Sequence, residues 1–225
     1  MKIALCLSGQ ARSYKEGYKY YLENLLKHHK VDVYIHTWSF PDVNNYIDLY
    51  QATAWDHQIP PLTEADKKYT NTPNAERHPP RFTESMLYSM NKCRKLLIGE
   101  YDWVIKSRSD YALNVKIPFD TLDNSKLYIP NCRMVPERDF GNDQFAFGSK
   151  DTMMKYMSTW ENMEDYYNAG AQFIGEDMMR ANLHHHNLHG ENLVYVNMNN
   201  PFPPGAYNGS WHSLIRDDVE QWKKS

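Results

Sequence analysis

The sequence has few cysteines, no long apolar run and no large excess of charge of either sign. Its three cysteines form no Cys-X-X-Cys pair, which excludes a disulfide scaffold and a cysteine-rich zinc module. No apolar run reaches about 18 residues, so we expect no membrane-spanning helix. Lys and Arg number 25 against 28 Asp and Glu, a formal charge of −3, which argues against a nucleic-acid partner bound through a broad basic face.

Aromatic residues are abundant in an otherwise polar chain. There are 17 Tyr, 6 Trp and 8 Phe, while the mean hydropathy is −0.75. Such a composition suits proteins that stack flat ligands such as sugars or bases, and it also describes chains with tyrosine-rich surfaces. The 225 residues can bury one sizeable core, so we expect a single domain over residues 1–225. Few cysteines fit a reducing compartment, which predicts a cytoplasmic protein (the host cytoplasm, if the chain is viral).

Short apolar runs alternate with helical patterns along the chain, which predicts the α/β class. We expect one domain with a mainly parallel central sheet of about six or seven strands, flanked by helices. The segment 41–82 is rich in proline and polar residues, so we expect it to be irregular, with a short strand and a turn of helix. The predicted strands are 2–7, 31–36, 101–105, 127–129, 144–147 and 193–196, and the predicted helices are 14–29, 83–98, 150–160 and 175–186.

Three predicted strands end in polar residues. In open α/β sheets, ligands bind beyond the carboxyl ends of the strands. The first of these ends combines a glycine turn, a hydroxyl and an arginine before a helix, which can cradle a diphosphate; a turn followed by a solvated arginine is the alternative. The candidate binding residues are Ser8, Gly9, Gln10 and Arg12 after the first strand, His36, Thr37 and Trp38 after the second, and Arg108 and Ser109 after the strand at 101–105.

Asp110 follows the strand at 101–105 at the same predicted edge. A carboxylate in that place can hold a divalent ion that in turn binds two phosphate oxygens. The alternative is that Asp110 pairs with Arg108 or caps a turn.

Four motifs in order resemble those of glycosyltransferases of bacterial lipopolysaccharide-core synthesis and of large algal (chlorella) viruses. They are Leu5 to Arg12, His36 to Trp38, Arg108 to Asp110 and Asp143 to Ser149. This resemblance implies the GT-A fold and a metal-dependent hexosyl transfer from a UDP- or GDP-type nucleotide-diphosphate sugar to a hydroxyl of a glycan or glycoprotein acceptor. The family's Asp-X-Asp motif is altered here, because Arg108 stands at its first position.

The resemblance also implies roles for single residues. Asp177, with Glu176 or Asp143 as alternatives, would be the general base of an inverting reaction. The other interpretation is that the two acidic residues in the first turn of this helix only complement the helix dipole. His212 would complete a Mn²⁺ or Mg²⁺ site with Asp110, unless it is an exposed loop histidine.

Asn142 and Gln144 would bind sugar hydroxyls, the alternative being a turn before an edge strand. Arg12 and Arg108 would add positive charge at the diphosphate.

Three other functions must be compared with a metal-dependent inverting transferase. Arg108 in place of an acidic residue is consistent with a catalytically degenerate module that only binds a nucleotide sugar. A retaining transferase of the same fold depends on carboxylate geometry that a sequence does not reveal. A metal-dependent phosphoryl transferase or nuclease would need a second cluster of carboxylates near Asp110, which the sequence does not offer.

Overall fold

Strands and helices alternate along the chain in the computed structural model, which describes residues 1–60, 64–73, 75, 76, 78–130 and 142–196. The strands are β1 (Lys2–Ser8), β2 (Lys30–Trp38), β3 (Ala54–Gln58), β4 (Trp103–Ser107), β5 (Leu127–Pro130), β6 (Ala146–Gly148) and β7 (Leu193–Val196). The helices are α1 (Tyr14–Tyr21), α2 (Val43–Tyr50), α3 (Ala65–Lys68), α4 (Pro80–Leu96), α5 (Lys150–Tyr156), α6 (Met163–Asn168) and α7 (Gly175–His185).

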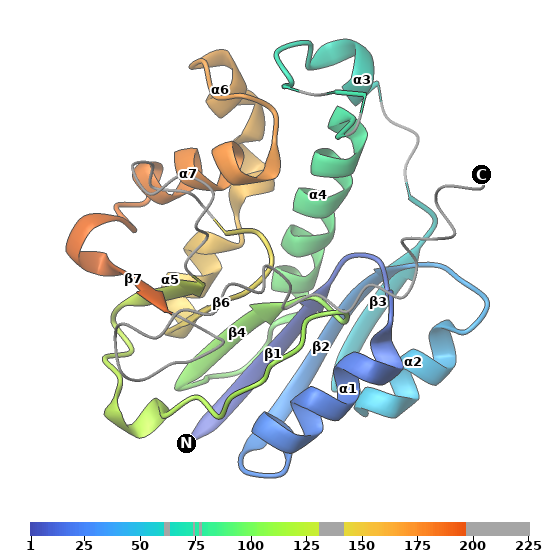
Figure 1. Cartoon of the computed structure of the whole chain (residues 1–225), viewed down its shortest axis with the longest axis vertical. Helices are drawn as coiled ribbons and strands as arrows, with labels where there is room; N and C mark the ends of the chain where they lie inside the picture. The colour runs from blue at the N-terminus through green and yellow to red at the C-terminus, as the bar shows by residue number, and fades with distance from the viewer. Residues whose placement is uncertain (61–63, 74, 77, 131–141, 197–225) are drawn as a thin grey trace.

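The described strands form one seven-stranded sheet in the order β3-β2-β1-β4-β6-β5-β7. β1 pairs in parallel with β2 and with β4, whereas β6 runs antiparallel to β4 and to β5. Helices cover both faces, as Figure 1 shows. The predicted α/β class, with a mainly parallel central sheet flanked by helices, is confirmed.

Alternate residues of β1 face opposite sides of the sheet, because successive side chains of a strand point in opposite directions. Ile3 and Leu5 pack in a core cluster with the tyrosines of α1 and α2. Ala4 and Cys6 pack in a second cluster with Leu87 and other residues of α4. The run of buried residues in β1 is therefore continuous, as expected for a strand covered on both faces.

The strand register brings the predicted motifs to one edge of the sheet. Ser8 at the end of β1 lies beside His36 of β2, and Leu7 lies beside Ser107 of β4. The antiparallel β6 begins where β4 ends, since Lys106 pairs with Ala146. The segment that precedes β6, residues 142–145, therefore reaches the same edge as the carboxyl ends of β1, β2 and β4.

The segment 41–82 is more regular than the sequence suggested. It contains α2, β3 and α3, and α4 already begins at Pro80, in the first turn of a helix, where proline is well tolerated. The buried residues of α2 include Val43, Tyr46 and Tyr50, a helical spacing that the neighbouring prolines obscured. β3 is a mostly polar strand at the end of the sheet, and its pairing with β2 decides its conformation.

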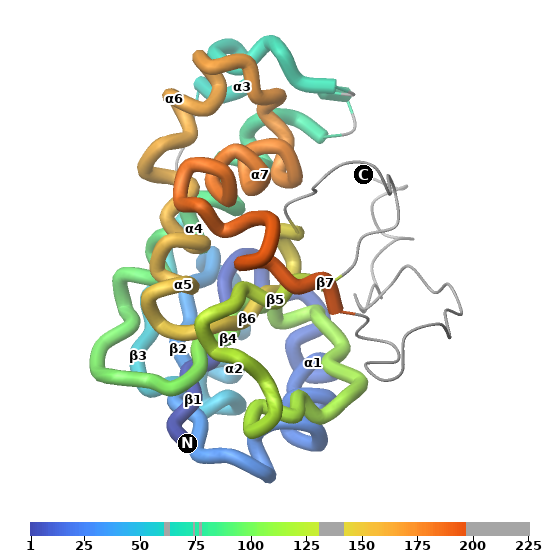
Figure 2. The backbone as a smooth tube through the Cα atoms, turned by 90° about the vertical axis from the view of Figure 1, so that its left-hand side faces the viewer, coloured from blue at the N-terminus to red at the C-terminus, as the bar shows by residue number. Residues whose placement is uncertain are grey.

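The helix predicted at 14–29 is also shorter and less regular than expected. α1 ends at Tyr21, and a wider π-type turn continues it from Leu22 to Leu26. In Figures 1 and 2, α3, α6 and α7 gather at one end of the molecule, beyond the edge that carries the motifs. Within the described ranges, no helix combines the length and the apolar character that crossing a membrane would require.

Candidate functional site

The turn after β1 is tied to the two elements beside it. Gly9 has φ +103°, a left-handed conformation that side chains other than glycine rarely adopt. Its N–H donates to the carbonyl oxygen of His36 at 3.1 Å and to Ser89 Oγ of α4 at 2.7 Å. Ser89 Oγ also lies 2.8 Å from His36 Nδ1. The glycine turn is therefore a fixed part of the sheet edge.

His36 and Thr37, two of the predicted binding residues, lie in the interior, and their contact with a ligand stays a prediction. Both side chains are fully buried. Burial lowers the pKa of His36 to about 4, so its imidazole is neutral near pH 7. Trp38 is partly exposed, and its ring stacks on Tyr88 with ring centroids 6.0 Å apart.

Ser109 joins the turn after β1 to the end of β4. Its hydroxyl donates to the carbonyl oxygen of Arg12 at 3.2 Å, and the carbonyl oxygen of Gln10 lies 3.4 Å from the same hydroxyl. The Arg12 side chain lies along the turn and donates from Nε to Gln10 Oε1 at 2.8 Å. Ser109 is itself buried. It therefore positions Gln10 and Arg12 and does not present its own hydroxyl to a ligand.

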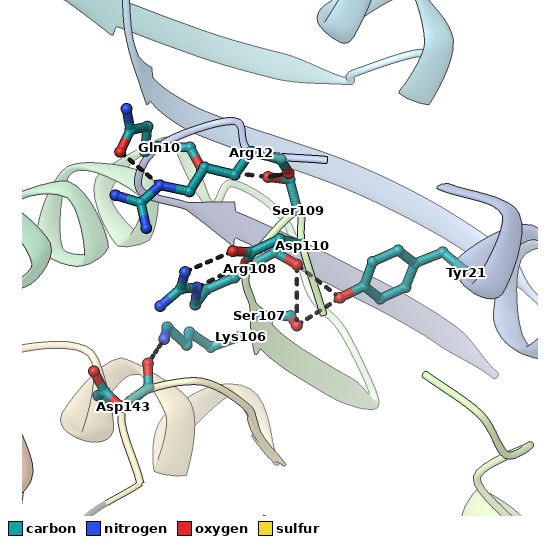
Figure 3. Close-up of polar contacts among 9 residues, drawn as sticks. All are labelled: Gln10, Arg12, Tyr21, Lys106, Ser107, Arg108, Ser109, Asp110 and Asp143. Atoms are coloured by element: carbon teal, nitrogen blue, oxygen red, sulfur yellow. Dashed lines mark hydrogen bonds and ion pairs between the residues drawn. The ribbon is translucent and has the colours of Figure 1, made fainter. Parts of the chain in front are cut away.

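Arg108 and Asp110 form a bidentate ion pair at the end of β4 (Figure 3). Arg108 Nε donates to Asp110 Oδ1 at 2.8 Å, and Nη2 donates to Oδ2 at 2.6 Å. The Asp110 side chain is 2% exposed, whereas the Arg108 side chain is 26% exposed. Tyr21 supports the pair from α1, since its hydroxyl donates to the carbonyl oxygen of Arg108 at 2.9 Å.

This arrangement does not fit the predicted metal site. Both carboxylate oxygens of Asp110 already accept from Arg108, so a divalent ion would have to displace the guanidinium. His212, the second predicted ligand, lies outside the described residues. In the part of the chain that the structure describes, no group of three or more His, Cys, Asp or Glu side chains is placed to hold an ion. In the structure Asp110 pairs with Arg108, which is the alternative that the sequence had left open.

Lys106 is a functional candidate that the sequence reasoning missed. It lies within β4 and is 1% exposed, and its ammonium contacts the carbonyl oxygen of Asp143. Burial lowers the pKa of Lys106 to about 8, and the nearby Asp143 carboxylate opposes that shift. Figure 3 shows the charged ends of Arg12, Arg108 and Lys106 extending toward the same side. A lysine in an otherwise apolar strand was the signal that could have revealed it.

Asp143 and Glu176 place two carboxyl groups next to this positive edge. Asp143 Oδ2 would lie 3.3 Å from a Cβ added at Gly175, so it sits close against the first residue of α7. Burial raises the pKa of Glu176, and the charge of Asp143 raises it further. These two predicted residues are thus brought together at the first turn of α7.

Asp177 and Asn142 serve local structure. Asp177 Oδ2 accepts from the backbone N–H of Gln172 at 2.8 Å, and Oδ1 lies 2.6 Å from Arg180 Nη2. Asn142 Oδ1 accepts from the backbone N–H of Gln144 at 2.8 Å, which closes the turn before β6. The Gln144 side chain is partly exposed at this turn. Both oxygens of the Asp177 carboxylate are therefore engaged, and its role as general base stays a prediction.

No protein-family model matches this sequence, and no curated protein matches it. Among solved structures, the chain is similar to an active-site mutant of LgtC, a glycosyltransferase of the GT-A fold. The TM-score is 0.53 at 13% sequence identity, and the match covers 88% of this chain and 73% of the LgtC chain. With the central sheet and its two helical layers, this likeness shows that the chain has the GT-A fold, as predicted.

Proposed function

We propose that residues 1–225 form one glycosyltransferase domain, which moves a hexose from a UDP- or GDP-type nucleotide-diphosphate sugar to a hydroxyl of a glycan or glycoprotein. One observation carries the proposal. Three cationic side chains, Arg12, Arg108 and Lys106, face one side at the carboxyl ends of β1 and β4, next to the carboxyl groups of Asp143 and Glu176. The GT-A fold and the four motifs in order support the same reading.

The donor's diphosphate would lie against the turn after β1 and the outer edge of Arg108. Backbone and side-chain groups of Gly9, Gln10 and Arg12 border this region, and arginine suits phosphate because its planar fork donates to two oxygens. As the bond from the sugar to the diphosphate breaks, negative charge grows on the leaving oxygen. The fixed cations of this edge stabilise that charge without having to move.

Glu176 is the residue we propose as general base, with Asp143 beside it. A base works best when its pKa lies near the operating pH, and burial with Asp143 nearby raises the pKa of Glu176 in that direction. Glu176 would take the proton of the acceptor hydroxyl while that oxygen attacks the anomeric carbon from the face opposite the diphosphate. Such a direct displacement inverts the configuration. Asp177 has both oxygens engaged and is the weaker candidate.

The predicted Mn²⁺ or Mg²⁺ has no part in this mechanism. Its proposed ligand Asp110 is paired with Arg108 through both carboxylate oxygens. The cytoplasmic location, expected from the few cysteines, remains part of the proposal, as does the kinship with lipopolysaccharide-core and chlorella-virus enzymes. The free thiols of Cys6 and Cys93, both buried, are consistent with a reducing compartment.

A binding module without turnover is the second candidate. The Arg108–Asp110 pair favours it, because it replaces the acidic motif on which metal-dependent members of the family rely. A retaining transferase of the same fold would share the donor site and differ in the stereochemistry of the product.

One assay separates these functions. The full chain is incubated with a panel of UDP-, GDP- and TDP-sugars, and donor binding is followed by thermal stabilisation. Release of nucleoside diphosphate measures turnover, and nuclear magnetic resonance of the product gives the anomeric configuration. Binding with release and an inverted product supports the proposal. Binding of a donor without release of nucleoside diphosphate would support the binding module. Release with a retained anomeric configuration would support the retaining transferase. No binding of any donor would refute all three functions.

A further inference from the structure

We propose that this chain binds the diphosphate of its donor without a divalent ion, because the guanidinium of Arg108 and the ammonium of Lys106 supply the positive charge there. The inference rests on the proposed function and concerns the same site. It starts from the pairing of Arg108 with Asp110, which takes the acidic group on which an ion would depend.

The ion pair with Arg108 fixes the position of the Asp110 carboxylate and also neutralises its charge. The Asp110 side chain is 2% exposed, and its two oxygens accept from two nitrogens of the same guanidinium. A bidentate pair of this kind is among the strongest polar contacts in proteins, and removing one partner leaves a buried charge uncompensated. An ion entering beside Asp110 would have to break this pair and turn Arg108 elsewhere.

The charge balance at the end of β4 leads to the same conclusion. An Asp-X-Asp motif carries two negative charges, which one divalent ion neutralises. Here Arg108 replaces the first carboxylate, so the pair with Asp110 is already neutral. A divalent ion added beside this neutral pair would face the cations of Arg108 and Lys106, whose charges the carboxylates of Asp110 and Asp143 already offset. Like charges at such short range in a buried environment strongly oppose that arrangement.

Arg108 keeps the means to bind phosphate while it holds Asp110. Asp110 engages Nε and Nη2, so N–H groups on the outer edge of the guanidinium remain available as donors. The Arg108 side chain is 26% exposed although its partner is buried, so its outer edge reaches the surface. Asp110 thus holds the buried edge of the guanidinium and leaves the opposite edge facing the surface.

Lys106 adds a second cation on the same strand. Its side chain is buried, and its ammonium contacts the backbone carbonyl of Asp143, with its charged end on the same side as that of Arg108 (Figure 3). Burying an ammonium is costly, and such a group gains most when an anion arrives beside it. A diphosphate bound at the exposed outer edge of Arg108 would bring such an anion toward Lys106.

Calorimetry of UDP and GDP binding to the full chain tests the inference. Titrations run in EDTA and in Mn²⁺, on the wild type and on Arg108→Gln and Arg108→Lys, with folding checked by circular dichroism. Arg94→Gln is the matched control, since Arg94 also pairs with a carboxylate, Glu161, in the last turn of α4. We expect equal wild-type affinity in both buffers, a loss of about tenfold or more in Arg108→Gln, a smaller loss in Arg108→Lys, and wild-type affinity in the control.

The wild-type titrations alone show whether nucleotide binding needs a divalent ion, even if a variant fails to fold. Binding of UDP or GDP that requires Mn²⁺ overturns the inference and leaves the proposed function standing. Binding of neither nucleotide in either buffer overturns both. A third substitution of Arg108 tests the role of its positive charge directly. Arg108→Asp recreates an Asp-X-Asp motif, and we expect its nucleotide binding to become dependent on Mn²⁺. Binding by Arg108→Asp that equals the wild type in EDTA would contradict the role assigned to the guanidinium.

Discussion

Gly17 of α1 lies directly against the backbone carbonyl of Ser109, where an added Cβ would be 1.8 Å from the carbonyl oxygen. No side chain fits at this distance, so the glycine allows α1 to pack on the segment that carries Arg108 and Asp110. The contact joins two stretches of chain that are far apart in sequence. It also makes the position of the Arg108–Asp110 pair dependent on a residue that touches no ligand.

We predict that Gly17→Ala disturbs the site from a distance. The added methyl group must push α1 away from Ser109, and overpacking of this kind costs about 1–3 kcal/mol of folding stability. UDP or GDP binding should weaken as well, because the end of β4 moves. Urea denaturation and calorimetry measure the two effects. Lys19→Ala, on the exposed side of the same helix, is the control and should change neither. A Gly17→Ala protein as stable as the wild type would show that the close approach is not rigid.

Ser89→Ala should loosen the glycine turn. The substitution removes the acceptor of the Gly9 N–H and the partner of His36 Nδ1 in a buried setting, which costs about 1–3 kcal/mol. Nucleotide binding should fall with it, since the Gly9 N–H of the turn after β1 loses one of its two acceptors. Ser158→Ala is matched to it: Ser158 is also buried and hydrogen-bonded, to the carbonyl oxygen of Lys155. The control should lose stability without losing nucleotide affinity, and equal affinity losses in both would argue against a specific role for Ser89.

Glu176→Gln should keep donor binding and lose transfer, by about 100-fold or more, because the general base is gone. In the wild type, the transfer rate should rise with pH as Glu176 loses its proton, with a midpoint above the usual range of glutamate, since burial and Asp143 raise its pKa. Asp177→Asn is the comparison. It should lower stability, because Asp177 accepts a hydrogen bond from the backbone of Gln172. It should move the midpoint of the pH profile only slightly downward, because the charge of Asp177 is the smallest of the influences on the pKa of Glu176. A severe loss of transfer in Asp177→Asn alone would return the base role to that residue.

Lys106 should make both stability and binding depend on pH. Burial lowers its pKa to about 8 in the folded protein, from the ordinary lysine value of 10.5. Between these two values the unfolded chain binds more protons than the folded chain, so this residue's contribution to stability increases as the pH rises through that window. The difference in unfolding free energy between the wild type and Lys106→Met should follow the same course.

Nucleotide affinity should change in the opposite direction. The diphosphate needs the charged ammonium, so the affinity for UDP or GDP should fall as the pH rises above about 8. Calorimetry from pH 7 to pH 10 measures it, with Lys106→Met as the reference that lacks this titration. An affinity that stays constant in the wild type across this range would remove Lys106 from the site.

Much of the fold was predictable because its signals are local. The apolar run of β1, the spacing of Met86, Leu87 and Met90 in α4, and the polar residues that follow the strands all lie within short stretches of chain. Parallel strands joined by helices must end at a common edge, so the position of the candidate site followed from the same patterns. A short strand was expected within 41–82, but not its position, because the polar residues of β3 become a strand only by pairing with β2.

The chain's own pattern of apolar, glycine and polar residues was enough to indicate an α/β fold with helices on both faces of a central sheet, and the edge of the sheet where its polar motifs gather. Both follow from the burial of apolar residues and from the alternation of strands and helices along the chain. Which groups are free to act was decided by contacts between distant segments. Whether Asp110 holds an ion or an arginine, and whether Asp177 or Glu176 is available as a base, depends on neighbours that only folding brings within reach. Burial and pairing set the charge of such groups, and neither is a property of one stretch of sequence.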